Sequence, residues 1–153
     1  MANTYTQIHL HLIFAVKFRS ALIEKTWKNE LHKYITGIVT NQNHKLLIID
    51  GAADHLHLLV GFRPHQSLAD LMQDIKGSSS HWINKNKLTP SNFAWQSGYG
   101  GFSCSKSDLP NLISYIENQE EHHRKIRFID EYKSVLIEND IDFDERYILK
   151  DPE

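Results

Sequence analysis

Residues 45–62 read KLLIIDGAADHLHLLVGF, and this stretch indicates two β-strands separated by a turn. The first apolar run covers Lys45 to Ile49 and is followed by Asp50-Gly51, a dipeptide typical of turns. The second run covers His55 to Phe62 and alternates in the two-residue period of a strand. We therefore predict a pair of strands at this point, and the flanking sequence decides what packs on them.

The segments on either side extend this pattern. Towards the N-terminus, Thr4–Phe18 alternates like a strand, and Glu24–Asn43 repeats apolar residues at helical spacing. Towards the C-terminus we expect a helix from Ser67, a short strand within Trp95–Ser105, a helix from Ser107 or Asp108 to about Arg127, and a last helix over about Ile129–Asn139. The order βαββαβ predicts an α+β fold: a ferredoxin-like (RRM-like) antiparallel sheet with extra C-terminal helices.

The composition is that of one globular domain over residues 1–153. With 41% hydrophobic and 24% charged residues, the chain has the apolar material for a core, which excludes a disordered protein. No apolar run approaches the roughly 18 residues of a membrane helix. The start of the chain lacks the pattern of a secretory signal, and Cys104 is the single cysteine. We expect no membrane association, a cytoplasmic protein, and no cysteine-based zinc finger.

The charge is unevenly distributed although the net charge is only −2. Residues 1–90 carry ten Lys and Arg against six Asp and Glu, whereas residues 91–153 carry seven against thirteen. A basic N-terminal half suits a polyanionic partner, with the acidic tail left in solvent. Ordinary charge scatter explains the same numbers equally well, so charge alone does not decide between them.

Two histidine pairs stand out among the ten histidines. His55 and His57 are two apart on a predicted strand, so both imidazoles point to one side and could hold a divalent metal. His9 and His11 have the same spacing on the first strand, and spacing does not choose between the pairs. We place the metal at the second pair and expect the first to be structural or to line a nearby groove. The alternative is that His55 and His57 are simply half-exposed strand residues.

A second constellation lies on the predicted helix after Ser107. Tyr115 and Gln119 are four residues apart and share a helical face, which His122 joins and His123 borders. A tyrosine beside a metal could serve as the nucleophile of phosphoryl transfer, with the metal stabilising the developing charge. Together with the histidine pair, this pattern indicates cleavage of a phosphodiester through a covalent phosphotyrosine. The alternative is a half-buried tyrosine next to a solvated glutamine.

At this point the chain resembles a known family over roughly residues 4–127. The matching pieces, in order, are Tyr5-Thr6-Gln7, His11, Phe14-Ala15-Val16-Lys17, Asp54-His55-Leu56-His57-Leu58-Leu59-Val60, Ile75-Lys76-Gly77-Ser78-Ser79-Ser80, Trp95-Gln96-Ser97-Gly98-Tyr99-Gly100-Gly101-Phe102-Ser103, Tyr115-Ile116-Glu117-Asn118-Gln119 and His122-His123. These pieces resemble the single-tyrosine HUH transposases of bacterial insertion sequences, the small type that moves single-stranded DNA.

The resemblance implies a role for each matching residue. His55, His57 and Gln119 would bind Mg²⁺ or Mn²⁺; this choice comes from the family, because the ligand types by themselves would point to Zn²⁺. Tyr115 would attack DNA and leave a 5′-phosphotyrosine and a free 3′-OH. Family members are homodimers in which the tyrosine helix of one subunit completes the site of the other. They recognise hairpins near the ends of the element in single-stranded DNA.

Four further residues are candidates for DNA contacts: Lys17, Arg19, Lys76 and Tyr99. The lysines and the arginine could contact phosphates, and the tyrosine could stack on an unpaired base. Three other functions compete with an active transposase. One is a domesticated relative tied to palindromic repeats, another is a HUH nickase of plasmid replication or transfer, and the third is a catalytically inactive single-strand-binding module.

Overall fold

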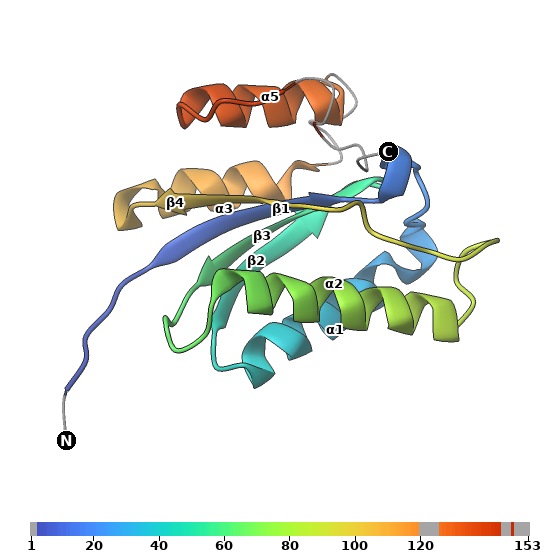
Figure 1. Ribbon diagram of the computed structural model, residues 1–153, viewed down its shortest axis with the longest axis horizontal. Coiled ribbons are helices and arrows are strands. Elements are labelled where there is room, and N and C mark those ends of the chain that lie inside the picture. Colours follow the sequence, from blue (N-terminus) through green and yellow to red (C-terminus); the bar gives the residue numbers. More distant parts are fainter. Residues whose placement is uncertain (1–2, 120–125, 145–147, 149–153) are drawn as a thin grey trace.

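The computed structural model describes residues 3–119, 126–144 and 148. Its centre is a four-stranded antiparallel sheet in the order β2-β3-β1-β4, shown in Figure 1. The strands are β1 (His9–Ala15), β2 (Lys45–Gly51), β3 (His55–Gly61) and β4 (Gly100–Cys104). This strand order with its two crossover helices confirms the ferredoxin-like α+β prediction.

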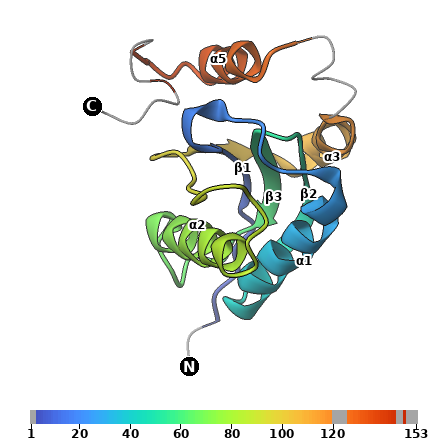
Figure 2. The same ribbon diagram turned by 90° about the vertical axis from the view of Figure 1, so that its right-hand side faces the viewer.

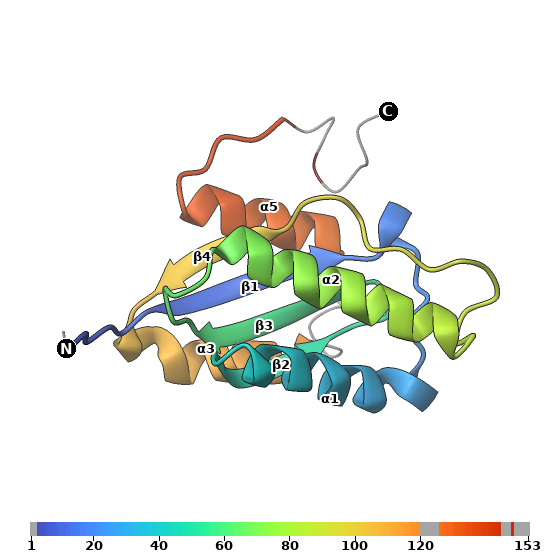
Figure 3. The ribbon, with the colours of Figure 1, turned by 60° about the horizontal axis from the view of Figure 1, so that its bottom comes forward.

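Two long helices cover one face of the sheet. They are α1 (Lys25–Asn41) and α2 (Leu68–Lys85), which lie side by side in front of the strands in Figure 3. Each helix buries an apolar stripe; in α1 it consists of Trp27, Leu31, Ile35 and Val39. The Ser67 hydroxyl begins α2 by accepting a hydrogen bond from the backbone N–H of Asp70. The principal core therefore lies between these helices and the sheet.

The opposite face is covered by the C-terminal part of the chain. Helix α3 (Leu109–Glu117) runs along β2, and α5 (Phe128–Glu138) packs over the middle of the sheet (Figure 2). A second apolar cluster joins the strands to α5; it comprises Ile13, Ala15, Phe102, Phe128, Tyr132, Leu136 and Ile148. Both faces of the central strands are therefore buried. This explains why six of the seven residues of β3 are inaccessible to solvent.

Two short 3₁₀ turns complete the described chain: η1 (Lys17–Arg19) after β1, and η2 (Lys106–Asp108) before α3. Phe18 and Arg19 in η1 both have positive φ angles, of 60° and 55°, so the chain turns sharply as it leaves β1. Among the described residues, no helix is long and apolar enough to cross a membrane.

The element boundaries correct two predictions. The first strand is shorter than Thr4–Phe18, because only His9–Ala15 pairs with β3, and of these residues only His9–Ile13 also pair with β4. The helix predicted to run to about Arg127 is interrupted: α3 ends at Glu117 and Asn118 forms a turn. The Asn118 side chain donates a hydrogen bond to the backbone carbonyl of Ser114, which is the local competition that makes asparagine a weak helix former.

Candidate active site

His55 and His57 lie next to each other on the face of β3 that α5 covers. Both side chains are 0% exposed. The ring of Phe128, from α5, stacks on the His55 ring with 4.0 Å between centroids and 15° between planes. The alternative of two half-exposed strand histidines is therefore wrong, because it took the second face of the sheet to be open to solvent.

A tight turn sets the position of His55 at the start of β3. A Cβ atom at Gly51 would overlap the backbone carbonyl oxygen of His55, so only glycine fits there. The backbone N–H of Ala52 donates to the same carbonyl at 3.1 Å. The side chain of Asp54 lies 2.7 Å from Nδ1 of His55, measured from its Oδ1 atom. The turn thus positions both His55 and its carboxylate partner Asp54.

The outer nitrogens of the two histidines face a common space. Nε2 of His55 lies 3.1 Å from Oε1 of Gln119 and 3.8 Å from Oε1 of Glu131. Nε2 of His57 lies 3.2 Å from the same Glu131 oxygen. The two Nδ1 atoms point elsewhere, towards Asp54 for His55 and towards Nε2 of His11 at 2.8 Å for His57.

Glu131 was not predicted from the sequence, yet it lies at the centre of the site. Its side chain is only 3% exposed, and His55, His57 and Glu131 offer ligand atoms that lie within 4.8 Å of one another. One sequence signal could have found it. Glu131 falls on the apolar stripe of the last helix beside Phe128 and Tyr132, where an isolated carboxylate is out of place.

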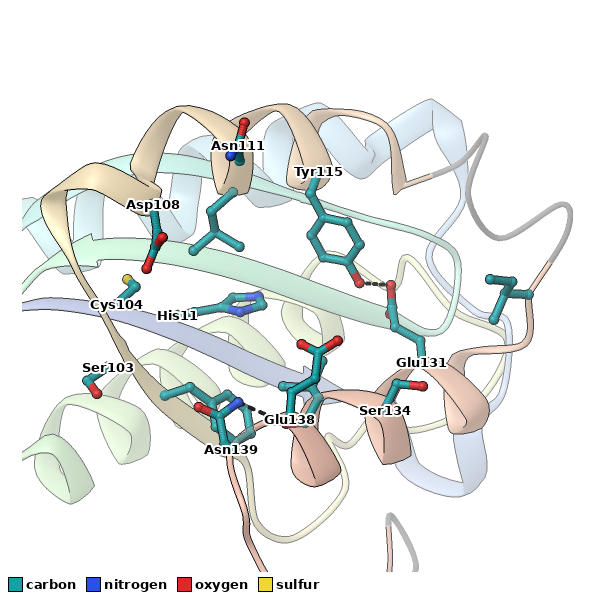
Figure 4. A pocket seen from close by; sticks show the side chains of 14 residues that line it. His11, Ser103, Cys104, Asp108, Asn111, Tyr115, Glu131, Ser134, Glu138 and Asn139 are labelled. Atoms are coloured by element: carbon teal, nitrogen blue, oxygen red, sulfur yellow. Dashed lines mark hydrogen bonds between the residues drawn. The ribbon is translucent and has the colours of Figure 1, made fainter.

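Tyr115 reaches the same carboxylate from α3. Its hydroxyl donates a hydrogen bond to Oε2 of Glu131, drawn as a dashed line in Figure 4. Its ring meets the His57 ring edge-on, with 5.8 Å between centroids. Burial, followed by the hydrogen bond and the negative charge of Glu131, raises the pKa of Tyr115 well above its usual value. The tyrosine is therefore a neutral phenol at physiological pH, beside a group that can take its proton.

The helical spacing of Tyr115 and Gln119 is preserved despite the end of α3 between them. The Gln119 amide donates from Nε2 to the backbone carbonyl of Tyr115 at 3.3 Å, which turns its Oε1 atom towards His55. The structure thus brings all four predicted site residues together within one chain. His122, expected on the same helical face, and His123, expected at its edge, lie outside the described residues.

The site can hold a divalent metal ion. Two imidazole nitrogens, one carboxylate oxygen and one amide oxygen converge on a buried space; imidazole suits Zn²⁺, and the oxygen ligands suit Mg²⁺ and Mn²⁺. Each histidine also has a hydrogen-bond partner on its other nitrogen, as metal-binding histidines do. The donor set therefore fits a metal, and Glu131 adds a carboxylate to the three ligands expected from the sequence.

A pocket of about 560 Å³ opens beside Tyr115, between β4, α3 and α5. Figure 4 shows His11 at its floor and the Tyr115 hydroxyl pointing into it. Asp108 and Glu138 also line it, and both are exposed. The pocket gives a substrate access to the tyrosine from solvent.

The four residues expected to contact DNA lie outside this pocket. Lys17 and Arg19 flank Phe18, whose side chain is 72% exposed. Tyr99 is partly exposed. The Lys76 ammonium donates to the backbone carbonyls of Gln96 and Gly98, at 2.6 and 2.8 Å, and so holds the loop before β4 in place.

A comparison with known protein families agrees with the geometry of this site. The family model described as IS200-like transposase matches residues 4–119, a stretch that contains both histidines, Tyr115 and Gln119. The chain belongs to the IS200-like transposase family. It is a DNA transposase, and the resemblance found in the sequence is confirmed.

Named relatives and solved structures agree with this family. The transposase is 26% identical over 121 residues to the ISDra2 transposase TnpA of Deinococcus radiodurans, covering 75% of this chain and 86% of that one. It is 25% identical over 130 residues to the IS200 transposase of Salmonella typhimurium, covering 81% and 84%.

Two solved structures share the fold of the transposase. A crystal structure from Deinococcus radiodurans, described as a candidate transposase, superposes with a TM-score of 0.61 at 24% identity, over 78% of this chain and 96% of that chain. A REP-associated tyrosine transposase bound to a REP hairpin gives 0.62 at 13% identity, over 83% and 75%.

Proposed function

We propose that this transposase, as a single catalytic domain, cleaves and rejoins single-stranded DNA through a 5′-phosphotyrosine on Tyr115. One observation carries the proposal: the Tyr115 hydroxyl and the outer nitrogens of His55 and His57 meet around Glu131 in a buried space. A nucleophile beside a metal-binding donor set is the arrangement that phosphoryl transfer needs. Intact residues at these positions argue against an inactive binding module.

His55, His57, Gln119 and Glu131 would hold Mg²⁺ or Mn²⁺. When bound, the metal would polarise the scissile phosphate and offset the negative charge that builds up on it. The protein's own part is orientation. Asp54 holds His55 through Nδ1, Phe128 stacks on its ring, and the backbone carbonyl of Tyr115 holds the Gln119 amide.

Tyr115 would attack the phosphorus atom as its proton passes to the Glu131 carboxylate, which already accepts a hydrogen bond from it. The bond from phosphorus to the 3′ oxygen breaks, and that oxygen leaves as a 3′-hydroxyl after protonation. The 5′ phosphate stays on the tyrosine, so the phosphodiester energy is kept. Attack by a 3′-hydroxyl reverses the step, releases the phenol and joins two DNA ends.

The substrate would be single-stranded DNA with hairpins near the ends of an insertion sequence. The solved REP-associated transposase with the same fold was bound to a hairpin, which supports this substrate class. Lys17 and Arg19 beside the exposed Phe18 form a surface suited to a flexible strand, because cations contact phosphates and an aromatic ring stacks on bases. Tyr99 offers a second partly exposed ring.

The active form would be a homodimer. In the single chain, Oε1 of Gln119 already lies 3.1 Å from Nε2 of His55. Completion of the site in trans would therefore exchange the segment with Tyr115 and Gln119 between subunits while keeping these contacts. Gly100 and Gly101, expected to give this segment its freedom, are paired with β1 in β4, so the exchange would pivot after β4, at residues 105–108.

The test is covalent capture of labelled hairpin DNA with a single-stranded flank. With Mg²⁺ or Mn²⁺, the wild-type chain should form a protein–DNA adduct that survives denaturing electrophoresis. Tyr115→Phe should form none while still binding the hairpin, because it lacks one oxygen only. Tyr34→Phe, which alters a tyrosine of α1 on the far side of the sheet, is the matched control and should react normally. An adduct with Tyr115→Phe would overturn the assignment.

A further inference from the structure

His11, from the first histidine pair, touches the metal site although it is not one of the proposed ligands. It lies on β1, next to β3 in the centre of the sheet, and is 5% exposed. Its Nε2 atom lies 2.8 Å from Nδ1 of His57, and the two rings are stacked with centroids 5.1 Å apart. His9 lies two residues earlier on the same side of β1, and among the described residues no side-chain hydrogen bond or ring contact joins it to this site.

We propose that His11 is a positioning residue: it accepts a hydrogen bond from Nδ1–H of His57 and thereby presents the Nε2 lone pair of His57 to the metal. The inference rests on the proposed function, because it concerns a ligand of the proposed metal centre. It also assigns a role to His11, which the two-residue spacing of His9 and His11 could not assign.

The argument follows from the protons of a neutral imidazole. Each ring carries one N–H and one lone pair, so two rings joined through Nε2 and Nδ1 must form one donor and one acceptor. A metal needs the lone pair on Nε2 of His57, which leaves the proton of that ring on Nδ1. His11 must then be the acceptor, with its own proton on Nδ1.

Glu131 makes this selection necessary. Its Oε1 atom lies 3.2 Å from Nε2 of His57 and would accept a hydrogen bond from that nitrogen, which favours the tautomer that cannot bind a metal. An acceptor on the opposite side of the His57 ring favours the competent tautomer. For His55, the Asp54 carboxylate is the acceptor at Nδ1. A carboxylate accepts a stronger hydrogen bond than a neutral imidazole, so His55 is held more firmly than His57.

Four variants of the full chain separate positioning from mere packing. His11→Phe keeps a ring and removes the acceptor, and His11→Leu removes both. His11→Gln places an amide oxygen at a similar reach, and His9→Phe is the matched control on the same strand face. Thermal melting without metal shows which variants fold, and calorimetric titration with Mn²⁺ gives the dissociation constants. The ¹⁵N shifts of His57 with Mg²⁺ report the tautomer.

We expect His11→Phe and His11→Leu to weaken Mn²⁺ binding by about 10- to 100-fold, as loss of a partner behind a metal ligand does. His11→Gln should regain most of the affinity, and His9→Phe should bind like wild type. Should His11→Phe fail to fold, His11→Leu against His11→Gln decides the question.

Three results would overturn the inference. Wild-type affinity in the folded apolar variants means that the acceptor is not needed, and leaves the proposed metal centre intact. A folded His11→Gln as weak as His11→Leu means that the ring itself matters, rather than its lone pair. No Mn²⁺ binding by the wild-type chain refutes the metal centre and the inference with it, which distinguishes that failure from the other two.

Discussion

Glu131→Gln separates the role of the buried carboxylate in metal binding from its role in the fold. The substitution keeps the shape of the side chain and removes its charge. Without metal, relief from burying a charge opposes the loss of the hydrogen bonds with Tyr115 and His57. We expect the free energy of unfolding to change by no more than about 2 kcal/mol, because these effects have opposite signs.

With metal, the two proteins should differ. At Mn²⁺ equal to 100 times the wild-type Kd, binding stabilises the folded chain by about 2.7 kcal/mol. For a chain of 153 residues this raises the Tm by roughly 5–11 °C. If loss of the carboxylate weakens binding by about 10- to 100-fold, the variant gains only about 0.4–1.4 kcal/mol, or roughly 1–6 °C.

The assay is thermal unfolding of both proteins with and without Mn²⁺ at that one concentration. Glu138→Gln is the matched control, because Glu138 is on the same helix and lines the same pocket but is exposed. It should show the wild-type shift. A Glu131→Gln chain with the full wild-type shift would refute the carboxylate as a ligand. Equal losses in both variants would show that the effect comes from the general acidity of the pocket.

His57→Ala should abolish adduct formation and His9→Ala should not, because His57 offers a ligand atom to the site and His9 has no side-chain hydrogen bond or ring contact with its described residues; the reverse pattern on a denaturing gel would move the metal to the first pair. If the site is completed in trans, mixed dimers of His57→Ala and Tyr115→Phe regain one intact site of two, and cleavage recovers; subunit exchange proven by tagged pulldown without recovery contradicts this. Burial, helped by Lys28, lowers the pKa of His32 to about 4, so the unfolded chain binds more protons between that value and about 6.5. The free energy of unfolding should therefore fall as the pH falls through this window, by up to about 1.4 kcal/mol per pH unit from this group. Urea titrations at pH 7 and pH 5 should show that His32→Gln loses less stability between these pH values than the wild-type chain does. An equal loss of stability in both proteins would be evidence against the lowered pKa of His32.

Local periodicity predicted the elements because it records which side of each element is buried. Leu12 and Phe14 point into the core between the sheet and helices α1 and α2, while Ile13 and Ala15 point towards α5. This is what the alternation in the first strand requires. Element ends were predicted less well. The limits of β1 depend on pairing with β3 and β4, and α3 ends at Asn118, whose side chain bonds the backbone carbonyl of Ser114.

The sequence by itself determined the parts of the site that lie close together in the chain. His55 and His57 share a face because strands alternate, and Tyr115 and Gln119 share one because a helix repeats about every fourth residue. Their grouping as one site came from the resemblance to a family, since no local period relates the strand to the helix. The placement of all four in one space follows from the fold.

Only the tertiary structure placed the partners of these residues. Glu131 lies 74 residues from His57 in the chain, and His11 lies 46 residues from it. Each reaches His57 because α5 closes over the second face of the sheet and β1 pairs with β3. Contacts between residues so far apart in the chain produce no periodic pattern in the sequence. They arise when distant segments pack together and bury polar groups that must then find hydrogen-bond partners in one another.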